Sequence, residues 1–407
     1  MKKNCIVAQS GGPTVAINAS LAGVIDGVIN SQKYDKIFGS IHGIQGVLKR
    51  NFLDLSNSSD DFIKQLSYSP AMYLGSCRFK LPNMDDDRNT YDTIFKVFED
   101  MNIGAFFYIG GNDSMDTVDK LSKYAKEIGS DILIAGIPKT IDNDLVVTDH
   151  TPGFGSAAKY IATSMREMAY DTYIYDIQSV LIVEIMGRDA GWLTAAAALA
   201  RTNFSEAPHL IYLPETNFDE NQFIEDIKAL LPVKKNVIVA VSEGIHDKDG
   251  NYVSATSAVA DKFGHAQLSG TGKYLENLVS ARLGVKVRSV EINVLQRSAA
   301  HMASKTDLEE AFLLGKKAVE YTEAGFSEFM TIITRTSNQP YQYEISHSPV
   351  IDIANQAKSV PREWINEAGN DVTEDMLTYL KPLIAGEIEL NYEDGIPCYP
   401  DIKHLTS

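Results

Sequence analysis

The sequence has 407 residues, of which 44% are hydrophobic. That apolar content excludes a disordered chain, and the length predicts two lobes rather than one small domain. Its 37 basic and 54 acidic side chains leave a formal net charge of −17. A negative field of this size disfavours nucleic acid and anionic membrane surfaces as partners. An anionic small-molecule substrate would therefore need a local cluster of basic residues.

The N-terminal segment and the cysteines indicate the compartment. The apolar run 5–8 is too short for the core of a signal peptide, and no segment approaches the length of a membrane span. Cys5, Cys77 and Cys398 are widely spaced, with no pair at metal-ligand spacing. Such spacing suits a reducing environment. We therefore expect a soluble cytoplasmic protein that uses neither a membrane nor nucleic acid as a partner.

Short apolar runs alternate with helix-like stretches along most of the chain. The runs that predict strands are 5–8, 105–109, 132–137, 180–185 and 237–241. Each run precedes a loop and a helical pattern, which is typical of parallel sheets with crossover helices. ILIAGI and VLIVEI are continuously apolar, which indicates strands covered on both faces. The predicted fold class is α/β, with two doubly wound, Rossmann-like lobes built on parallel sheets.

The predicted lobes divide the chain at about residue 150. The first lobe is expected over 1–150, with the helix-like segment in 296–325 packing back on it, and the second over 151–295. The remaining residues, 326–407, mix an apolar run, MTIIT, with loops that contain Pro and Tyr. The sequence assigns no role to this C-terminal extension.

Unusual loops follow the predicted strands, where ligands of such sheets bind. SGGP, residues 10–13, would let backbone amides approach a phosphate at a helix N-terminus, although a tight strand-to-helix turn also explains its glycines. GGNDS, residues 110–114, offers oxygen ligands for Mg²⁺ from Asn112 and Asp113. Alternatively, these two residues only cap a helix and turn the chain.

PKTIDND, residues 138–144, is the richest of these loops. It places Asp142 and Asp144 two residues apart, beside Lys139 and Thr140, at the end of an apolar strand. The lysine would lower the pKa of a carboxylate, so one acid could act as a general base while the other holds a metal or its water. A solvated charged loop is the alternative.

Other candidates lie further along the chain. MGRDAGW, residues 186–192, would direct Arg188 at a ligand, or would simply enter a helix with Asp189 as its cap. Further residues suited to phosphate or sugar are Arg78, Glu243, Arg288 and Arg297. Singly, each is more often part of a surface salt bridge. Together, glycine loops, carboxylates and arginines at strand ends predict phosphoryl transfer. The sequence has no GxxxxGK[ST] loop and no HRD or DFG motif, which excludes the two commonest folds that transfer phosphoryl groups from nucleotides.

The chain resembles the phosphofructokinase family from about residue 8 to residue 300. The motifs that carry the resemblance occur in the family's order and are SGGPTVAINA, YLGSCRF, IGGNDS, PKTIDND, VEIMGRDAGW, SEG and VRSVEINVLQR. The resemblance implies an enzyme that phosphorylates the C1 hydroxyl of fructose 6-phosphate in the cleft between the lobes. It also implies a homodimer or homotetramer, because a neighbouring subunit completes the family's sugar-phosphate pocket.

The resemblance also implies a role for individual residues. Those expected to be catalytic, with Asp142 as the general base, are Asp142, Lys139, Asp113 and Arg78. Those expected to bind the sugar phosphate are Thr140, Ile141, Asp144, Met186, Gly187, Arg188, Glu243, Arg288 and Arg297. Those expected to bind the phosphoryl donor are Gly11, Gly12 and Lys139, and those expected to hold Mg²⁺ are Asn112 and Asp113.

Two positions predict which phosphoryl donor is used. The branch of the family that uses ATP has glycine where this chain has Asp113 and Lys139. A carboxylate at the first position would lie where the α-phosphate of a nucleotide must lie, whereas the lysine would neutralise pyrophosphate. We therefore expect pyrophosphate as donor. The alternatives are an ATP-dependent enzyme and a catalytically silent subunit that binds sugar phosphate, although an intact PKTIDND loop speaks against the silent subunit.

Several positions depart from the family pattern, among them residues 296–299, which read QRSA in place of QRGG. Asn112 replaces the usual aspartate of the metal loop, Ser179 replaces an arginine, and Val294 replaces a histidine. The last two changes lie near the expected sugar-phosphate pocket. We therefore expect that pocket to differ in detail from the family's usual one.

Overall fold

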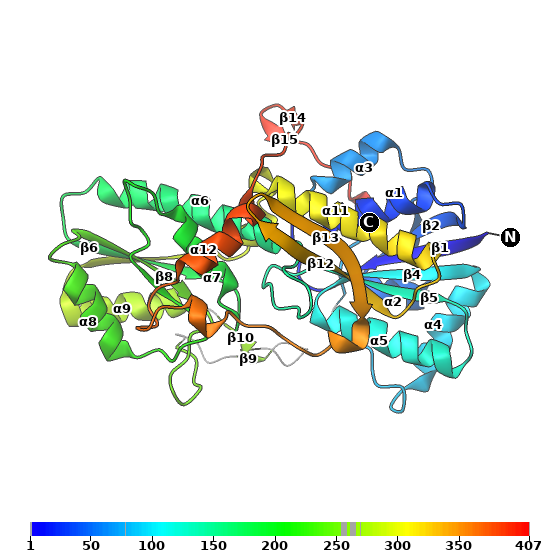
Figure 1. The fold of residues 1–407 in the computed structure, drawn as a ribbon, viewed down its shortest axis with the longest axis horizontal. Coiled ribbons are helices and arrows are strands. Elements are labelled where there is room, and N and C mark those ends of the chain that lie inside the picture. Colours follow the sequence, from blue (N-terminus) through cyan, green and yellow to red (C-terminus); the bar gives the residue numbers. More distant parts are fainter. Residues whose placement is uncertain (1, 78, 254–258, 261–265, 269, 407) are drawn as a thin grey trace.

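The computed structural model describes residues 2–77, 79–253, 259–260, 266–268 and 270–406 (Figure 1). The described chain forms two lobes, each built around one main sheet, and the long helix α6, Phe154–Tyr173, follows the crossing from the first lobe to the second. Among the described residues, no helix combines the length and the apolarity needed to cross a membrane.

The first lobe contains a seven-stranded sheet in the order β13-β12-β5-β4-β1-β2-β3. Its strands are β1 Lys3–Gln9, β2 Tyr34–Ser40, β3 Phe52–Asp54, β4 Ile103–Gly110, β5 Leu133–Pro138, β12 Phe329–Asn338 and β13 Tyr341–Pro349. The central neighbours are parallel, but β3 and β13 run antiparallel at the two edges. The expectation of a purely parallel sheet is therefore wrong at the edges, where a short connection returns the chain beside the preceding strand.

Helices cover both faces of this sheet. They are α1 Ile17–Ile29, α2 Gly43–Lys49, α3 Asp60–Ser67, α4 Arg88–Asp100, α5 Asn112–Glu127 and α11 Lys305–Glu323. Helices α1 and α11 lie on one face of the sheet, and α4 and α5 lie on the other (Figure 1). Alternate residues of β1 point to opposite faces, so Val7 packs in the core with α1 and α11, while Ile6 packs in the core with α4 and α5. Gly23 lets α1 approach α11 closely, since a Cβ there would lie 1.9 Å from the carbonyl oxygen of Phe312.

The second lobe contains a four-stranded, all-parallel sheet in the order β11-β6-β8-β7. Its strands are β6 Ser179–Ile185, β7 Leu210–Tyr212, β8 Asn236–Ser242 and β11 Lys286–Glu291. One face packs against α8, Glu220–Leu230, and α9, Thr271–Leu283, and the other against α6 and α7, Trp192–Ala196. Shorter elements in this part of the chain are η1 Ala197–Ala200, β9 Val259–Ala260, β10 Ala266–Gln267, α10 Leu295–Ser298 and η2 Ala300–Met302. Of these, η2 packs through Ala300 in a core with α1 and α11 of the first lobe.

The segment after residue 326 spans both lobes (Figure 1). Its first part supplies β12 and β13 to the first sheet, because the apolar MTIIT run pairs beside β5. The next part packs on α6 and α7 of the second lobe through α12, Glu374–Leu380. Its remaining elements are η3 Val350–Asp352, η4 Arg362–Trp364, η5 Lys381–Ile384, β14 Tyr392–Glu393, β15 Ile396–Pro397 and α13 Lys403–Thr406.

Candidate functional site

The site is assembled from loops at the carboxyl ends of parallel strands in both lobes. The first lobe contributes the turn after β1 and the loop 139–153 after β5, while the second contributes the loop 186–191 after β6 and Glu243 directly after β8. The charge of Arg188 acts on the pKa of Asp142, and the charge of Asp142 acts on the pKa of Glu243. These electrostatic interactions join the two lobes around one site.

Lys139 forms the donor side of the site together with the turn after β1. Its side chain is only 2% exposed, and its Nζ donates a hydrogen bond to the carbonyl oxygen of Gly12 at 2.7 Å. Gly11 has a φ of +81°, and a Cβ there would lie 3.1 Å from that Nζ. Glycine is therefore favoured at this position both by its backbone conformation and by the closeness of the lysine.

Burial lowers the pKa of Lys139 to about 8, because an ammonium group loses hydration in this environment. The carboxylates of Asp142 and Asp144 act against this decrease, and the positive charge of Arg297 adds to it. The lysine is therefore a cation near neutral pH whose proton is held less firmly than in water.

Asp142 is half-buried and lies among three cations. Burial raises its pKa, whereas the positive charges of Arg188, Lys139 and Arg297 oppose that rise. Its backbone N–H donates to the hydroxyl oxygen of Thr140 at 3.1 Å, which helps to turn the loop. Burial and the neighbouring Asp142 charge raise the pKa of Asp144 to about 6. The pair therefore offers a proton acceptor surrounded by positive charge.

Glu243 organises the side of the site that the second lobe contributes. Its Oε1 accepts hydrogen bonds from the backbone N–H groups of Gly187, at 3.3 Å, and Arg188, at 3.1 Å. Burial raises the pKa of Glu243 to about 7, and the charges of Asp142 and Glu184 act in the same direction. Two amide donors that favour its charged form act against that rise.

Comparison with known proteins explains this arrangement. The family model described as phosphofructokinase matches residues 4–322. The chain belongs to the phosphofructokinase family. A relative from Xanthomonas campestris pv. campestris (strain B100), named pyrophosphate–fructose 6-phosphate 1-phosphotransferase, is 42% identical over 99% of this chain and 97% of its own. A relative of the same name from Halomonas elongata is 40% identical over 97% of this chain and 94% of its own.

Two solved structures have the same fold over nearly the whole chain. The pyrophosphate-dependent phosphofructokinase from Marinobacter aquaeolei gives a TM-score of 0.88 at 38% identity, covering 98% of this chain and 95% of that one. The enzyme of the same description from Nitrosospira multiformis gives a TM-score of 0.89 at 38% identity, covering 98% and 96%. The predicted α/β fold with two lobes is therefore confirmed.

Most of the residues that the sequence predicts for the site lie together in the structure. Those in or directly beside the loops described above are Gly11, Gly12, Lys139, Thr140, Ile141, Asp142, Asp144, Met186, Gly187, Arg188, Glu243 and Arg297. The Gln296 side chain ties the last of these to the loop after β6, because its Oε1 accepts from the backbone N–H of Met186 at 3.2 Å. Sequence reasoning missed Gln296, although it directly precedes Arg297.

Four of the residues expected at the site are not in the group just named. Arg288 lies exposed on the edge strand β11. The Asn112 side chain accepts from the backbone N–H of Asn355 at 2.6 Å and donates to the carbonyl oxygen of Gln356. Asp113 is exposed in the first turn of α5. Arg78 lies outside the residues that the structure describes.

The structure adds a residue from the C-terminal segment that no local pattern predicts. The backbone N–H of Lys358 donates to the carbonyl oxygen of Asp144 at 2.8 Å, and its Nζ donates to the carbonyl oxygens of Thr148 and Asp149. Burial lowers the pKa of Lys358 to about 8. A contact over this separation in sequence depends on the tertiary fold, so sequence periodicity carries no signal for it.

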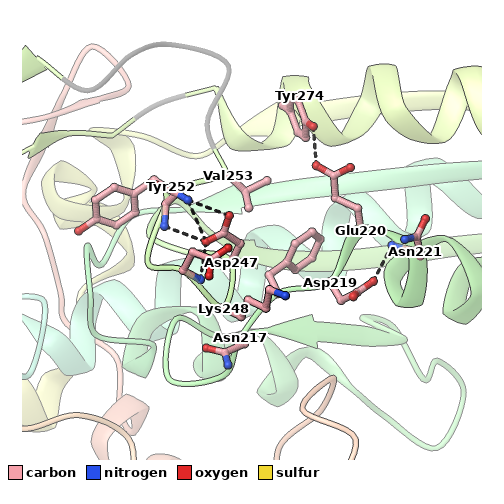
Figure 2. Close-up of a pocket in the computed structure, with 12 residues that line it drawn as sticks. Asn217, Asp219, Glu220, Asn221, Asp247, Lys248, Tyr252, Val253 and Tyr274 are labelled. Carbon is pink, nitrogen blue, oxygen red and sulfur yellow. Dashed lines mark hydrogen bonds between the residues drawn. The ribbon is translucent and has the colours of Figure 1, made fainter.

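A surface pocket of about 490 Å³ lies elsewhere on the second lobe, at α8 and the turn after β8 (Figure 2). Its carboxylates bind local partners: Asp247 accepts from the backbone N–H of Asn251 at 2.9 Å, and Glu220 accepts from the hydroxyl of Tyr274. None of the predicted site residues lines it. Within the described part of the chain, no three His, Cys, Asp or Glu residues gather closely enough to hold a metal ion.

Proposed function

We propose that the chain is a pyrophosphate-dependent phosphofructokinase. It transfers a phosphoryl group reversibly from pyrophosphate to the C1 hydroxyl of fructose 6-phosphate, with Mg²⁺, and forms fructose 1,6-bisphosphate and orthophosphate. The observation that carries this proposal is the buried Lys139, bonded to Gly12 and adjacent to the Asp142 loop. The names of the relatives from Xanthomonas campestris and Halomonas elongata support the same activity.

Pyrophosphate lacks a nucleoside, so charge and backbone contacts must hold it in line for attack. We assign this work to Lys139 and to the backbone of Gly11 and Gly12, with Arg78 as a further cation. Asp113 is exposed at the first turn of α5. The negative charge of its carboxylate repels the α-phosphate of ATP and so disfavours ATP binding. The buried ammonium also stabilises the negative charge that develops on the leaving phosphate.

Asp142 is the proposed general base. As the C1 oxygen forms a bond to the terminal phosphorus of pyrophosphate, its proton passes to the Asp142 carboxylate, and the bond to the bridging oxygen breaks to release orthophosphate. The nearby charges of Arg188, Lys139 and Arg297 support this role, because they oppose the rise in the pKa of Asp142 that burial causes. In the reverse reaction, the protonated Asp142 returns its proton to the C1 oxygen.

The sugar phosphate is held by loops of both lobes. Glu243, which orients the amides of Gly187 and Arg188, is assigned to the sugar hydroxyls. The space around the sugar hydroxyls is lined by the backbone of Met186 and by the 140–144 loop, which includes Thr140, Ile141 and Asp144. Arg297 is assigned to the 6-phosphate, because a guanidinium matches phosphate geometry.

Mg²⁺ is the proposed metal ion, and it would neutralise charge on the reacting phosphates. The chain need supply only one or two carboxylates, since substrate phosphates and water complete the shell of this ion. Asp113 fits because its carboxylate is exposed at the start of α5. Asn112 fits less well, since its side chain already bonds to Asn355 and Gln356, and we assign it to the loop that positions Asp113.

We also propose a homodimer or homotetramer in the cytoplasm. Arg288 lies exposed on the edge strand β11 together with the exposed Val290, and Ile177, which is also exposed, lies just before the neighbouring strand β6. An interface along this edge would bury those residues and bring Arg288 to the 6-phosphate pocket of a second copy. The cysteines are unpaired, which supports a reducing compartment.

Phosphorus NMR tests the activity directly. Fructose 6-phosphate, pyrophosphate and Mg²⁺ are mixed with the protein, and the pyrophosphate signal should convert into signals of orthophosphate and of a phosphate ester at C1. Starting from fructose 1,6-bisphosphate and orthophosphate, the same sample should produce pyrophosphate. Failure to form fructose 1,6-bisphosphate from either donor, pyrophosphate or ATP, would refute the proposal.

A further inference from the structure

The loop that carries Asp142 depends on neighbouring elements for its shape. Between β5 and α6, residues 139–153 form no helix or strand apart from an isolated bridge between Thr140 and Gly153. The backbone adopts left-handed conformations at Asn143, with φ of 55°, and at Val147, with φ of 70°. Such conformations persist in non-glycine residues only when the surroundings hold them in place.

Asn143, the residue directly after Asp142, is the buried anchor of this loop. Its side chain is 0% exposed, whereas Asp142 beside it is half-buried. Its Oδ1 accepts from the backbone N–H of Thr151 at 3.1 Å, and its Nδ2 donates to the hydroxyl oxygen of Tyr379 at 2.8 Å. The direction of the Asp142 side chain is therefore tied to the position of Asn143.

The hydroxyl of Tyr379 joins two separate points of the loop. It accepts from Asn143 and donates to the carbonyl oxygen of Asp149 at 2.9 Å. A phenol has one donor and acceptor capacity, so this single oxygen serves as a bridge across the loop. Without it, a buried amide and a carbonyl would each lose a partner, which is costly inside a protein.

Tyr379 is itself held firmly in place. The guanidinium of Arg335 on β12 lies 4.6 Å from its ring and donates to its carbonyl oxygen at 3.0 Å. The same guanidinium binds the Asp149 carboxylate, with Nη2 at 2.9 Å. The rings of Trp192 and Trp364 pack against Tyr379 at 5.4 and 5.3 Å. The bridging hydroxyl is therefore fixed by elements of both lobes.

We propose that Tyr379 is a positioning residue for Asp142. Its hydroxyl fixes Asn143 and thereby the direction in which the neighbouring carboxylate faces the acceptor hydroxyl. The inference rests on the proposed function for the role of Asp142, but the bridge itself does not. Tyr379 lies beyond residue 322, where the match to the family model ends, so the C-terminal segment supplies this contact.

Kinetics of Tyr379→Phe and of Tyr212→Phe test the role. Both tyrosines are 7% exposed, and Tyr212 on β7 donates a partly buried hydrogen bond to Asp226 at 2.7 Å, away from the loop. Tyr379→Phe should lower kcat about tenfold while the KM of both substrates changes by less than about twofold, because a misplaced base slows the chemical step more than binding. Tyr212→Phe should keep the wild-type kcat. Equal kcat values in the two variants would overturn the proposal.

Hydrogen–deuterium exchange supplies a measurement that needs no turnover. Amides in residues 139–153 should exchange faster in Tyr379→Phe than in the wild type, and at the wild-type rate in Tyr212→Phe. If the wild type shows no phosphoryl transfer, the proposed function fails while this comparison still decides the bridge. Unchanged exchange of the loop in Tyr379→Phe would overturn the inference whatever the activity.

Discussion

Asp142 combines two requirements that normally conflict. A base must be shielded from water to face the acceptor hydroxyl, yet shielding alone raises the pKa of a carboxyl group and favours its protonated form. Here the charges of Arg188, Lys139 and Arg297 oppose the effect of burial. The proposed mechanism therefore depends on cations supplied by loops of both lobes.

The first prediction removes the base. Asp142→Asn should lower kcat for fructose 6-phosphate phosphorylation by roughly 10² to 10⁴ and leave the KM values nearly unchanged, because the amide keeps the shape but accepts no proton. Steady-state kinetics in both directions measure the effect. Wild-type turnover in this variant would show that another group takes the proton.

The second prediction concerns the pH dependence of pyrophosphate binding. The pKa of Lys139 is lowered from 10.5 to about 8, so its charge is present below pH 8 and is lost as the pH rises through that value. The KM for pyrophosphate should be flat below about pH 8 and rise above it. Lys139→Met should show a high KM without the break, and a break at the same pH in this variant would contradict the assignment.

At the scale of elements, the loop 139–153 is stabilised by a buried ionic network. His150 is 1% exposed, with Nδ1 2.8 Å from the carboxylate of Asp149 and Nε2 2.6 Å from that of Glu310. Arg335 and Tyr341 complete the network, binding Asp149 and Glu310 respectively. These residues come from the loop, α11, β12 and β13. The network therefore connects the site to the first sheet.

The third prediction follows from this network. Burial disfavours the charged imidazole, but the charges of Glu310 and Asp149 outweigh burial and raise the pKa of His150 from 6.5 to about 9. The stabilising contribution is fully present below pH 6.5 and is lost as the pH rises through 9. His150→Gln should therefore lower the Tm more at pH 6 than at pH 9.5. An equal loss at both values would contradict a charged histidine.

The elements differ in how far the sequence predicts them. β1, β4, β5, β6 and β8 coincide with continuous apolar runs, since strands buried on both faces need apolar residues throughout. β11 carries no such signal, because its KVRSVE sequence has only two apolar residues and its edge position leaves most of it exposed. The hydrogen bonds of Tyr379 to the loop could not be predicted for a different reason. The sequence pattern near residue 143 is local and does not indicate a partner so far along the chain.

At the scale of the whole molecule, three cations cluster around one carboxylate in a strongly acidic chain. The net charge is −17, yet Lys139, Arg188 and Arg297 all act on one carboxylate. The glycine loops and the PKTIDND carboxylates could be recognised from sequence because they follow apolar strands directly. The placement of Arg288 on an exposed edge could not, because it depends on the order of strands in the second sheet.

The fourth prediction tests whether sites are shared between copies. If Arg288 serves the pocket of a second subunit, mixed oligomers of Asp142→Asn and Arg288→Ala contain one complete site for each pair of unlike chains. Statistical mixing should then restore roughly a quarter of wild-type activity, although each variant alone is weak. A mixture no more active than the sum of its parts would contradict a shared site.

The fifth prediction concerns the phosphoryl donor, which is the central claim. A carboxylate about 4 Å from an α-phosphate charge, at an effective dielectric near 20, opposes binding by roughly 4 kcal/mol, and Asp113 is proposed to supply that repulsion. Each factor of ten corresponds to about 1.4 kcal/mol, so pyrophosphate should exceed ATP by about 10³ in kcat/KM. Asp113→Gly should narrow the gap but also weaken pyrophosphate turnover, since Asp113 is assigned to Mg²⁺.

The most direct measurement is kcat/KM of the wild-type protein for pyrophosphate and for ATP, with fructose 6-phosphate saturating and Mg²⁺ present. We expect turnover with pyrophosphate and little or none with ATP. An ATP value equal to or above the pyrophosphate value would contradict the proposed donor and the roles given to Asp113 and Lys139.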